Sequence, residues 1–233
     1  MTAALELANL TSGYGSSSVV HGVSLAIAPG EILALVGKNG MGKSSLLKTI
    51  LSFLPAWDGA VRLDGRDVTR LAPFRKRALG LAYSPQEQAL FQDLSVRDNL
   101  RLGLSDDRGF EASLSDVNGW FPVLAARMSQ RAGTLSGGEQ KMLIVARGLI
   151  AKPRLLLLDE VTEGLQPSVV DRLAEVLSAT RRERGTAMLV VEQHLSFVLG
   201  LADRFAVLKR GEIVDTAPVD ANSMARIDEH MRL

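Results

Sequence analysis

The stretch Gly37-Lys-Asn-Gly-Met-Gly-Lys43-Ser44 decides the fold of this 233-residue chain. It fits the pattern G-x-x-x-x-G-K-[ST], in which the backbone N–H groups of a glycine-rich loop surround nucleotide phosphates. Lys43 is expected to reach the β- and γ-phosphates, and the Ser44 hydroxyl to bind Mg²⁺. By itself the pattern also suits a flexible surface loop. The apolar run 32–36 before it and the helical spacing of 45–51 after it give strand, loop and helix, the order that phosphate binding requires.

Composition sets the broad class of the protein. The chain is 46% hydrophobic and 23% charged, which is typical of a globular domain. Its net charge of +1 disfavours DNA or RNA binding without excluding it, and the absence of cysteine excludes disulfides and thiolate metal sites. Neither a signal peptide nor an apolar run of about 20 residues is present, so any link to a membrane is expected to come through a partner.

Strand-like and helix-like patterns alternate along most of the sequence. This alternation predicts an α/β fold with a mainly parallel central sheet, preceded by an N-terminal antiparallel β subdomain. Residues 94–134 have helical patterns and no good strand, which indicates a helical lobe inserted in a single domain covering 1–233. The tail 222–233 is expected to form an amphipathic helix. The expected strands are 5–10, 19–28, 32–36, 59–65, 79–83, 154–158, 187–191, 205–208 and 212–214.

A second run, Leu155-Leu-Leu-Leu-Asp159-Glu160, is an apolar strand that ends in two carboxylates. In open α/β sheets, ligands bind at the carboxyl ends of such strands. Asp159 is expected to bond Mg²⁺-bound water or approach the metal itself, and Glu160 to position or deprotonate the water that attacks the γ-phosphate. Alone, this run more often marks a strand emerging into solvent; together with the phosphate loop it indicates nucleotide hydrolysis.

Three further residues stand where a nucleotide site could use them. His194 follows the expected strand 187–191 and could bond the γ-phosphate or the attacking water; a partly buried structural histidine is the alternative. Gln86 follows the strand 79–83 and could bind Mg²⁺ and sense the γ-phosphate, or be an ordinary turn residue. Tyr14, between two glycines, could stack on adenine or pack on a strand.

The run Ser136-Gly-Gly-Glu139-Gln140 opens an expected helix. Ser136 and Glu139 have the spacing of a capping box. Capping does not explain Gly137 and Gly138, because two glycines in the first turn cost helix stability. They leave bare amides at a positive helix end, which is a second anion site. One nucleotide does not need two such sites, so we expect each chain to supply one to its own ATP and one to its neighbour's.

From Tyr14 to Gly211 the chain resembles the ATP-binding subunits of ABC transporters. The phosphate loop, Gln86, the run LSGGEQ at 135–140, the strand LLLLDE and His194 occur in the order of that family. Within the family, the phrases NGMGKSSLLKTI, QRAGTLSGGEQ, DEVTEGLQP and VEQHLSFVLGLADR are similar to the second ATPase subunit of branched-chain amino-acid importers and their urea-importing relatives. The run LSGGEQ excludes an ordinary P-loop kinase or GTPase.

The resemblance implies a P-loop NTPase that hydrolyses ATP with Mg²⁺ and powers a membrane importer. The implied partners are two transmembrane permease subunits, a paralogous ATPase or a second copy as dimer partner, and, indirectly, a periplasmic binding protein. A permease helix would dock near the Gln86 loop and the helical lobe, so Phe91 and Leu94 are expected in an exposed apolar groove. The place of action would be the cytoplasmic face of the inner membrane. The transported solute does not follow from the sequence.

The resemblance also assigns roles to individual residues. Catalysis falls to Glu160, His194 and Gln86, and metal binding to Ser44 and Gln86. Contact with the ATP held by the neighbouring subunit falls to Ser136, Gly137, Gly138 and Gln140. The residues that bind the chain's own ATP are Tyr14, Gly37, Asn39, Gly40, Gly42, Lys43, Ser44, Ser45 and Asp159.

Three positions depart from the family pattern. Val161 stands where a proline commonly follows the catalytic glutamate, and Gln166 replaces the usual aspartate of the dimer-interface loop. Ser44 and Ser45 replace the commoner threonines. None of these changes removes a catalytic group, which argues against a regulatory module without turnover. A soluble ABC ATPase that acts in cofactor assembly or on nucleic acid, with no membrane partner, is the alternative function.

Overall fold

The computed structural model describes residues 2–86 and 90–232. Its central sheet has six strands in the order β10-β9-β3-β8-β7-β6, all parallel to their neighbours except the antiparallel pair β9–β10. The strands are β3 (Ile32–Val36), β6 (Leu81–Ser84), β7 (Leu155–Asp159), β8 (Ala187–Val191), β9 (Arg204–Lys209) and β10 (Glu212–Pro218). Because the parallel strands point the same way, the residues that follow β3, β6, β7 and β8 gather at one edge.

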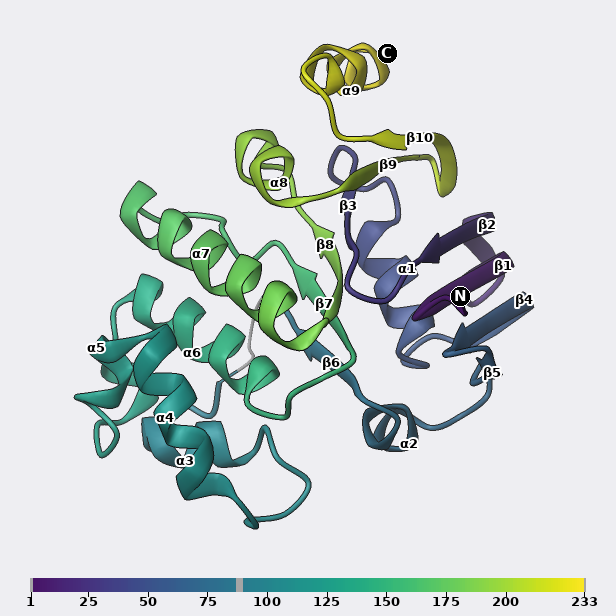
Figure 1. Ribbon diagram of the computed structural model, residues 1–233. Helices are drawn as coiled ribbons and strands as arrows, with labels where there is room; N and C mark the ends of the chain where they lie inside the picture. The colour runs from purple at the N-terminus through teal and green to yellow at the C-terminus, as the bar shows by residue number, and fades with distance from the viewer. Residues whose placement is uncertain (1, 87–89, 233) are drawn as a thin grey trace.

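The central strands are buried on both faces, which explains their unbroken apolar runs. In β3, Ile32, Ala34 and Val36 belong to one hydrophobic cluster, whereas Leu33 and Leu35 belong to another. The side chains of a strand alternate between its two faces, so this sheet separates two cores. Figure 1 shows the layers that supply them: α6 and α7 on one side of the sheet, and α1 with the N-terminal strands on the other.

The second sheet is antiparallel, with four strands in the order β2-β1-β4-β5. Its strands are β1 (Leu5–Tyr14), β2 (Ser17–Ile27), β4 (Ala56–Leu63) and β5 (Arg66–Asp67). Helix α1 (Lys43–Ile50) lies between the two sheets and buries Leu46, Leu47 and Ile50 in the core that they share. The predicted fold class is therefore confirmed, including the antiparallel subdomain at the N-terminus.

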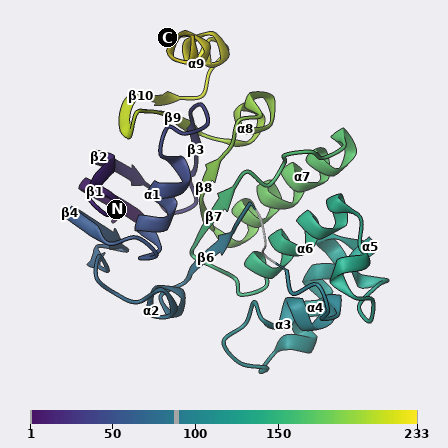
Figure 2. The same ribbon diagram turned by 180° about the vertical axis from the view of Figure 1, so that it is seen from behind.

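On the other face, α6 (Gly137–Leu149) and α7 (Pro167–Arg184) pack on the central sheet beside α8 (Leu195–Leu201). Helices α3 (Val96–Arg101), α4 (Phe110–Trp120), α5 (Pro122–Ala125) and the 3₁₀ turn η1 (Ala132–Thr134) fall within the stretch 94–134 that the sequence predicts as a helical lobe. Figure 2 shows this group beyond α6, far from the antiparallel sheet. Buried Asn99 holds the segment that leads into this helical lobe, since the Asn99 amide donates to the carbonyl oxygens of Phe91 and Ser95 at 3.0 and 3.1 Å.

Two short helices have no counterpart in the patterns read from the sequence. Helix α2 (Pro73–Ala78) starts at a proline, whose fixed φ suits a first helical turn. Helix α8, seven residues long, follows His194 directly. The tail forms α9 (Ser223–Met231), within the range predicted for it. No helix in the described part of the chain has the length and apolar character needed to cross a bilayer.

Candidate functional site

The phosphate loop joins β3 to α1, as the sequence predicts. Gly40 and Gly42 adopt φ values of 78° and 100°, which side chains disfavour. A Cβ at Gly37 would come within 2.4 Å of the Leu208 carbonyl oxygen, so β9 also demands glycine there. The first turn of α1 carries no acidic residue, which leaves its positive N-terminus free for an anion.

Lys43 lies inside this loop with only 4% of its surface exposed. Its ammonium donates to the carbonyl oxygens of Gly37 at 2.7 Å and Lys38 at 3.2 Å, and lies 3.4 Å from Oε1 of Glu160. The lysine is therefore held by the loop and by the glutamate that the sequence assigns to catalysis.

The two carboxylates of β7 have different surroundings. Oδ2 of Asp159 accepts a hydrogen bond from the Tyr83 hydroxyl at 3.2 Å, whereas its buried Oδ1 has no partner within residues 2–86 and 90–232. Burial raises the pKa of Asp159, the charge of Glu160 acts in the same direction, and the Tyr83 hydroxyl opposes them. The Ser44 hydroxyl and the Lys43 ammonium also lower the pKa of Asp159, so both lie close to this buried carboxylate, and such a group suits a hydrated cation.

Glu160 is held by donors from three directions. Besides Lys43, the amide of Gln193 donates to Oε1 at 2.9 Å and the amide of Gln86 to Oε2 at 3.0 Å. The backbone of Glu160 has a φ of 45°, a left-handed conformation that costs energy for a non-glycine residue. These contacts aim the carboxylate into the same space as the Lys43 ammonium.

Gln86 reaches the site as the sequence predicts, but its amide nitrogen is shared. It donates to Glu160 and, at 2.7 Å, to Oε2 of Glu163. Lys141 of α6 fixes the backbone beside it, since its ammonium donates to the Gln86 carbonyl oxygen at 2.6 Å. Residues 87–89 of the predicted loop lie outside the described part of the chain.

Two predicted residues stand at the rim. His194 is exposed, and its Nε2 lies 3.0 Å from the Ser196 hydroxyl; no described contact joins it to Glu160 or Asp159. Tyr14 is 47% exposed, and its hydroxyl lies 3.5 Å from Oγ of Ser45, so the ring stands beside the start of α1. Its surface is free for contact with a planar ring, while Asn39 of the loop is exposed to solvent.

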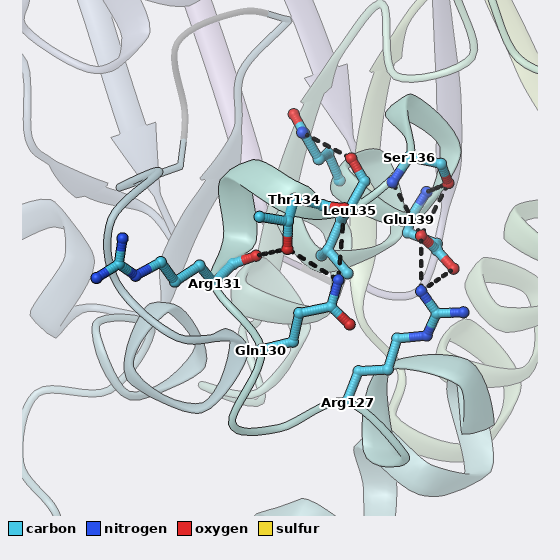
Figure 3. A network of polar contacts seen from close by, with 8 residues as sticks. Arg127, Gln130, Arg131, Thr134, Leu135, Ser136 and Glu139 are labelled. Atoms are coloured by element: carbon cyan, nitrogen blue, oxygen red, sulfur yellow. Dashed lines mark hydrogen bonds and ion pairs between the residues drawn. The ribbon is translucent and has the colours of Figure 1, made fainter.

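The second glycine-rich run forms the N-terminus of α6. Ser136 and Glu139 make the predicted capping box: the Ser136 backbone N–H donates to Oε2 of Glu139 at 2.9 Å, and the Glu139 backbone N–H donates to the Ser136 hydroxyl oxygen at 3.4 Å. Figure 3 shows Arg127 of the helical lobe pointing at Glu139, with an Nη1–Oε1 distance of 3.2 Å. Gly137 and its neighbour Gly138 begin the helix behind this cap, and the amide of Gln140 donates to the Leu135 carbonyl oxygen at 3.1 Å.

Four residues near Glu160 were missed by the sequence analysis: Tyr83, Lys141, Glu163 and Gln193. Tyr83 lies in β6 next to β7, and Gln193 lies two residues after β8 on the other side of β7. Only Gln193 had a signal in the sequence, because it precedes His194 directly after a buried strand.

A phosphate loop that joins β3 to a helix, with an Asp-Glu pair at the end of β7, two strands away in the sheet, defines a P-loop nucleotide-binding domain. Residues 20–163 match the family described as ABC transporter, and the chain belongs to that family. It is an ATPase of the ABC type, which binds nucleotide and hydrolyses ATP.

Named relatives cover nearly the whole chain. The high-affinity branched-chain amino acid transport ATP-binding protein BraG of Pseudomonas aeruginosa is 38% identical over 212 residues, covering 90% of this chain and 91% of BraG. The probable branched-chain amino acid transport ATP-binding protein LivF of Archaeoglobus fulgidus is 34% identical over 211 residues, covering 90% and 89%. The crystal structure of a nucleotide-free ATP-binding cassette from an ABC transporter has a TM-score of 0.88 at 22% identity, covering 97% and 95%, which shows a common fold.

Proposed function

We propose that this ATPase powers the import of branched-chain or related hydrophobic amino acids, or of a similar small solute, through two permease subunits. The observation that carries the proposal is the likeness to BraG over nine-tenths of both chains. LivF has a name of the same kind. The chain would work at the cytoplasmic face of the inner membrane, held there by its partners, and a periplasmic binding protein would deliver the solute.

In this proposal the chain's residues act mainly by position and charge, since phosphoryl transfer needs little covalent help. Lys43 would turn from Glu160 to the β- and γ-phosphates, and Glu160 would then be free to orient and deprotonate the attacking water. Ser44, Asp159 and Gln86 would hold Mg²⁺, which when bound neutralises phosphate charge. Tyr14 would stack on adenine, and His194 would have to move from Ser196 to reach the γ-phosphate.

A groove beside the Gln86 segment is the proposed docking site for the permease. It encloses about 530 Å³ between α2, β6, α3 and α6, and its exposed apolar residues are Phe53, Phe74, Phe91 and Leu102. Phe91 is 59% exposed, as predicted; Leu94 is 38% exposed but does not line the groove. Burial, and next the charge of Arg77, lowers the pKa of Arg147 in the same groove. An apolar helix with a carboxylate facing these two arginines would fit it.

The nucleotide would be shared between two ATPase subunits. Ser136, Gly137, Gly138 and Gln140 would contact ATP held by the neighbour's phosphate loop, whether that neighbour is a paralogue or a second copy. The first turn of α6 supports this role, because it begins with two glycines and its one acidic residue is the capping Glu139, which pairs with Arg127.

Uptake of radiolabelled leucine tests the proposal. A strain lacking this chain should lose most high-affinity uptake, and the parent chain should restore it. Lys43→Ala should not restore uptake, because it removes the ammonium that binds the phosphates. Lys48→Ala changes an exposed lysine on the same helix and should restore uptake fully. Unchanged uptake in the deletion strain would refute the substrate class, and restoration by Lys43→Ala would refute the role of the phosphate loop.

A further inference from the structure

Glu192 is a buried carboxylate that the mechanism above does not use. It directly follows β8, is 2% exposed, and has no cationic partner in the part of the chain that the structure describes. Burial raises the pKa of Glu192, and the backbone N–H of Thr162 works in the opposite direction. An apolar side chain of similar volume would commonly be at least as stable in such a place. Stability alone therefore does not account for Glu192.

The contacts of Glu192 show what it holds. Its Oε1 accepts a hydrogen bond from the backbone N–H of Thr162 at 2.8 Å, and its Oε2 accepts one from the N–H of Gln193 at 3.3 Å. Two N–H groups from different segments converge on one side chain. A carboxylate suits this position because it only accepts, whereas an amide or hydroxyl brings hydrogens that need partners of their own.

Thr162 lies two residues after Glu160, at the end of a strained turn. The left-handed backbone of Glu160 is held by its own N–H, which donates to the Val191 carbonyl oxygen at 2.9 Å. The bond from Thr162 to Glu192 fastens the far end of the same turn to the same strand end. The Gln193 amide then holds the Glu160 carboxylate itself. Three successive residues, 191–193, thus fix the backbone and the side chain of Glu160.

We infer that Glu192 is a positioning residue for ATP hydrolysis, which acts by holding the turn 160–162 so that Glu160 is aimed at the attacking water. The inference rests on the proposed role of Glu160. On this inference, the residues at the end of β8 contribute to hydrolysis by holding Glu160, independently of any role of His194. A displaced Glu160 would lower turnover without weakening ATP binding, because the Lys43 ammonium keeps its contacts with the Gly37 and Lys38 carbonyl oxygens of the phosphate loop.

Steady-state ATP hydrolysis by the full chain tests this role. Glu192→Leu removes the acceptor at similar volume and should lower kcat at least about tenfold without raising KM more than about twofold. Glu192→Gln retains an oxygen for the Thr162 N–H but turns amide hydrogens toward the N–H of Gln193, so it should lower kcat by no more than about threefold. Glu31→Leu is the control, because Glu31 also accepts a backbone N–H, from Ala28 at 2.6 Å, and pairs with Arg204, but it lies at the end of β3 away from the phosphate loop. It should lower the melting temperature and leave kcat unchanged.

Three outcomes would overturn the inference: a parental kcat in Glu192→Leu, a change confined to KM, or a loss in Glu192→Gln as large as in Glu192→Leu. If Glu192→Leu does not fold, Glu192→Asp decides, since the shorter carboxylate draws back from Thr162; kcat should fall, and a parental value refutes the role. The variant Glu160→Gln tests the proposed role of Glu160 separately from the inferred role of Glu192. Normal turnover there would refute the proposed role of Glu160, whereas an inactive Glu160→Gln beside an active Glu192→Leu would refute the role of Glu192 alone.

Discussion

Replacing Glu160 by glutamine is expected to tighten ATP binding. In the structure the Lys43 ammonium lies 3.4 Å from Oε1 of Glu160, and the two side chains are only 4% and 7% exposed. ATP must draw the ammonium away from this carboxylate before its phosphates can bind there. Part of the binding free energy is therefore spent on separating a buried ion pair.

The size of the effect follows from that distance. If the ammonium moves to about 6 Å from the carboxylate, Coulomb's law with an effective dielectric constant of about 20 gives a difference of about 2 kcal/mol. This corresponds to a roughly 30-fold lower Kd for Glu160→Gln. The neutral amide also no longer repels the γ-phosphate, which acts in the same direction.

Isothermal titration calorimetry with a non-hydrolysable ATP analogue measures this Kd. Glu163→Gln is the control, since it removes a neighbouring carboxylate that contacts Gln86 and has no described contact with Lys43. Its Kd should change far less. The double variant Lys43→Ala, Glu160→Gln completes a cycle in which the gain should largely disappear. An unchanged Kd in Glu160→Gln, or an equal gain in the Lys43→Ala background, would refute the reasoning.

Two further predictions concern assembly and stability. Because Glu160→Gln slows hydrolysis, it should form an ATP-dependent dimer in size-exclusion chromatography, alone or with the paralogous ATPase. Adding Ser136→Arg should abolish this dimer, whereas adding Ser129→Arg in the helical lobe should not. A dimer that survives Ser136→Arg would contradict the shared nucleotide site. The Lys76 ammonium is buried and donates to the Ile50 carbonyl oxygen at 2.6 Å, and burial lowers its pKa to about 8 from 10.5. Between these two pKa values the unfolded chain binds more protons than the folded chain. The free energy of urea unfolding of the parent should therefore rise relative to that of Lys76→Met from about pH 7.5 to about pH 9.5. A difference between the two free energies that stays constant over this range would disprove the pKa shift.

The sequence predicts those parts of the site whose residues are consecutive. The phosphate loop and the pair Asp159–Glu160 each follow an apolar run, and their chemistry is visible in a few adjacent letters. The capping box of Ser136 is local in the same way. Burial on both faces of the sheet was also predictable, because an unbroken run of leucines suits no exposed strand.

The contacts around Glu160 could not be read from the sequence, because they depend on strand order. Tyr83 and Gln193 come from β6 and β8, which flank β7 only in the folded sheet. Glu192 looked like an ordinary strand end, and its burial follows from the turn that closes over it. His194 was assigned to the site from its position, but its side chain lies against Ser196.

The strand order also governs how this protein is made. β3, which carries the phosphate loop, pairs with β8 and β9, so Ile32 meets Met188 and Leu33 meets Arg204. At a synthesis rate of about 5–20 residues per second, β3 waits roughly 10 to 30 seconds on the ribosome before either neighbour emerges. During that time both its hydrogen-bonding edges and its apolar side chains are without their native cover. The antiparallel sheet, complete once β5 has emerged, can form early and shelter one of its faces. We therefore expect nascent chains longer than the first sheet and shorter than β9 to depend most on chaperones.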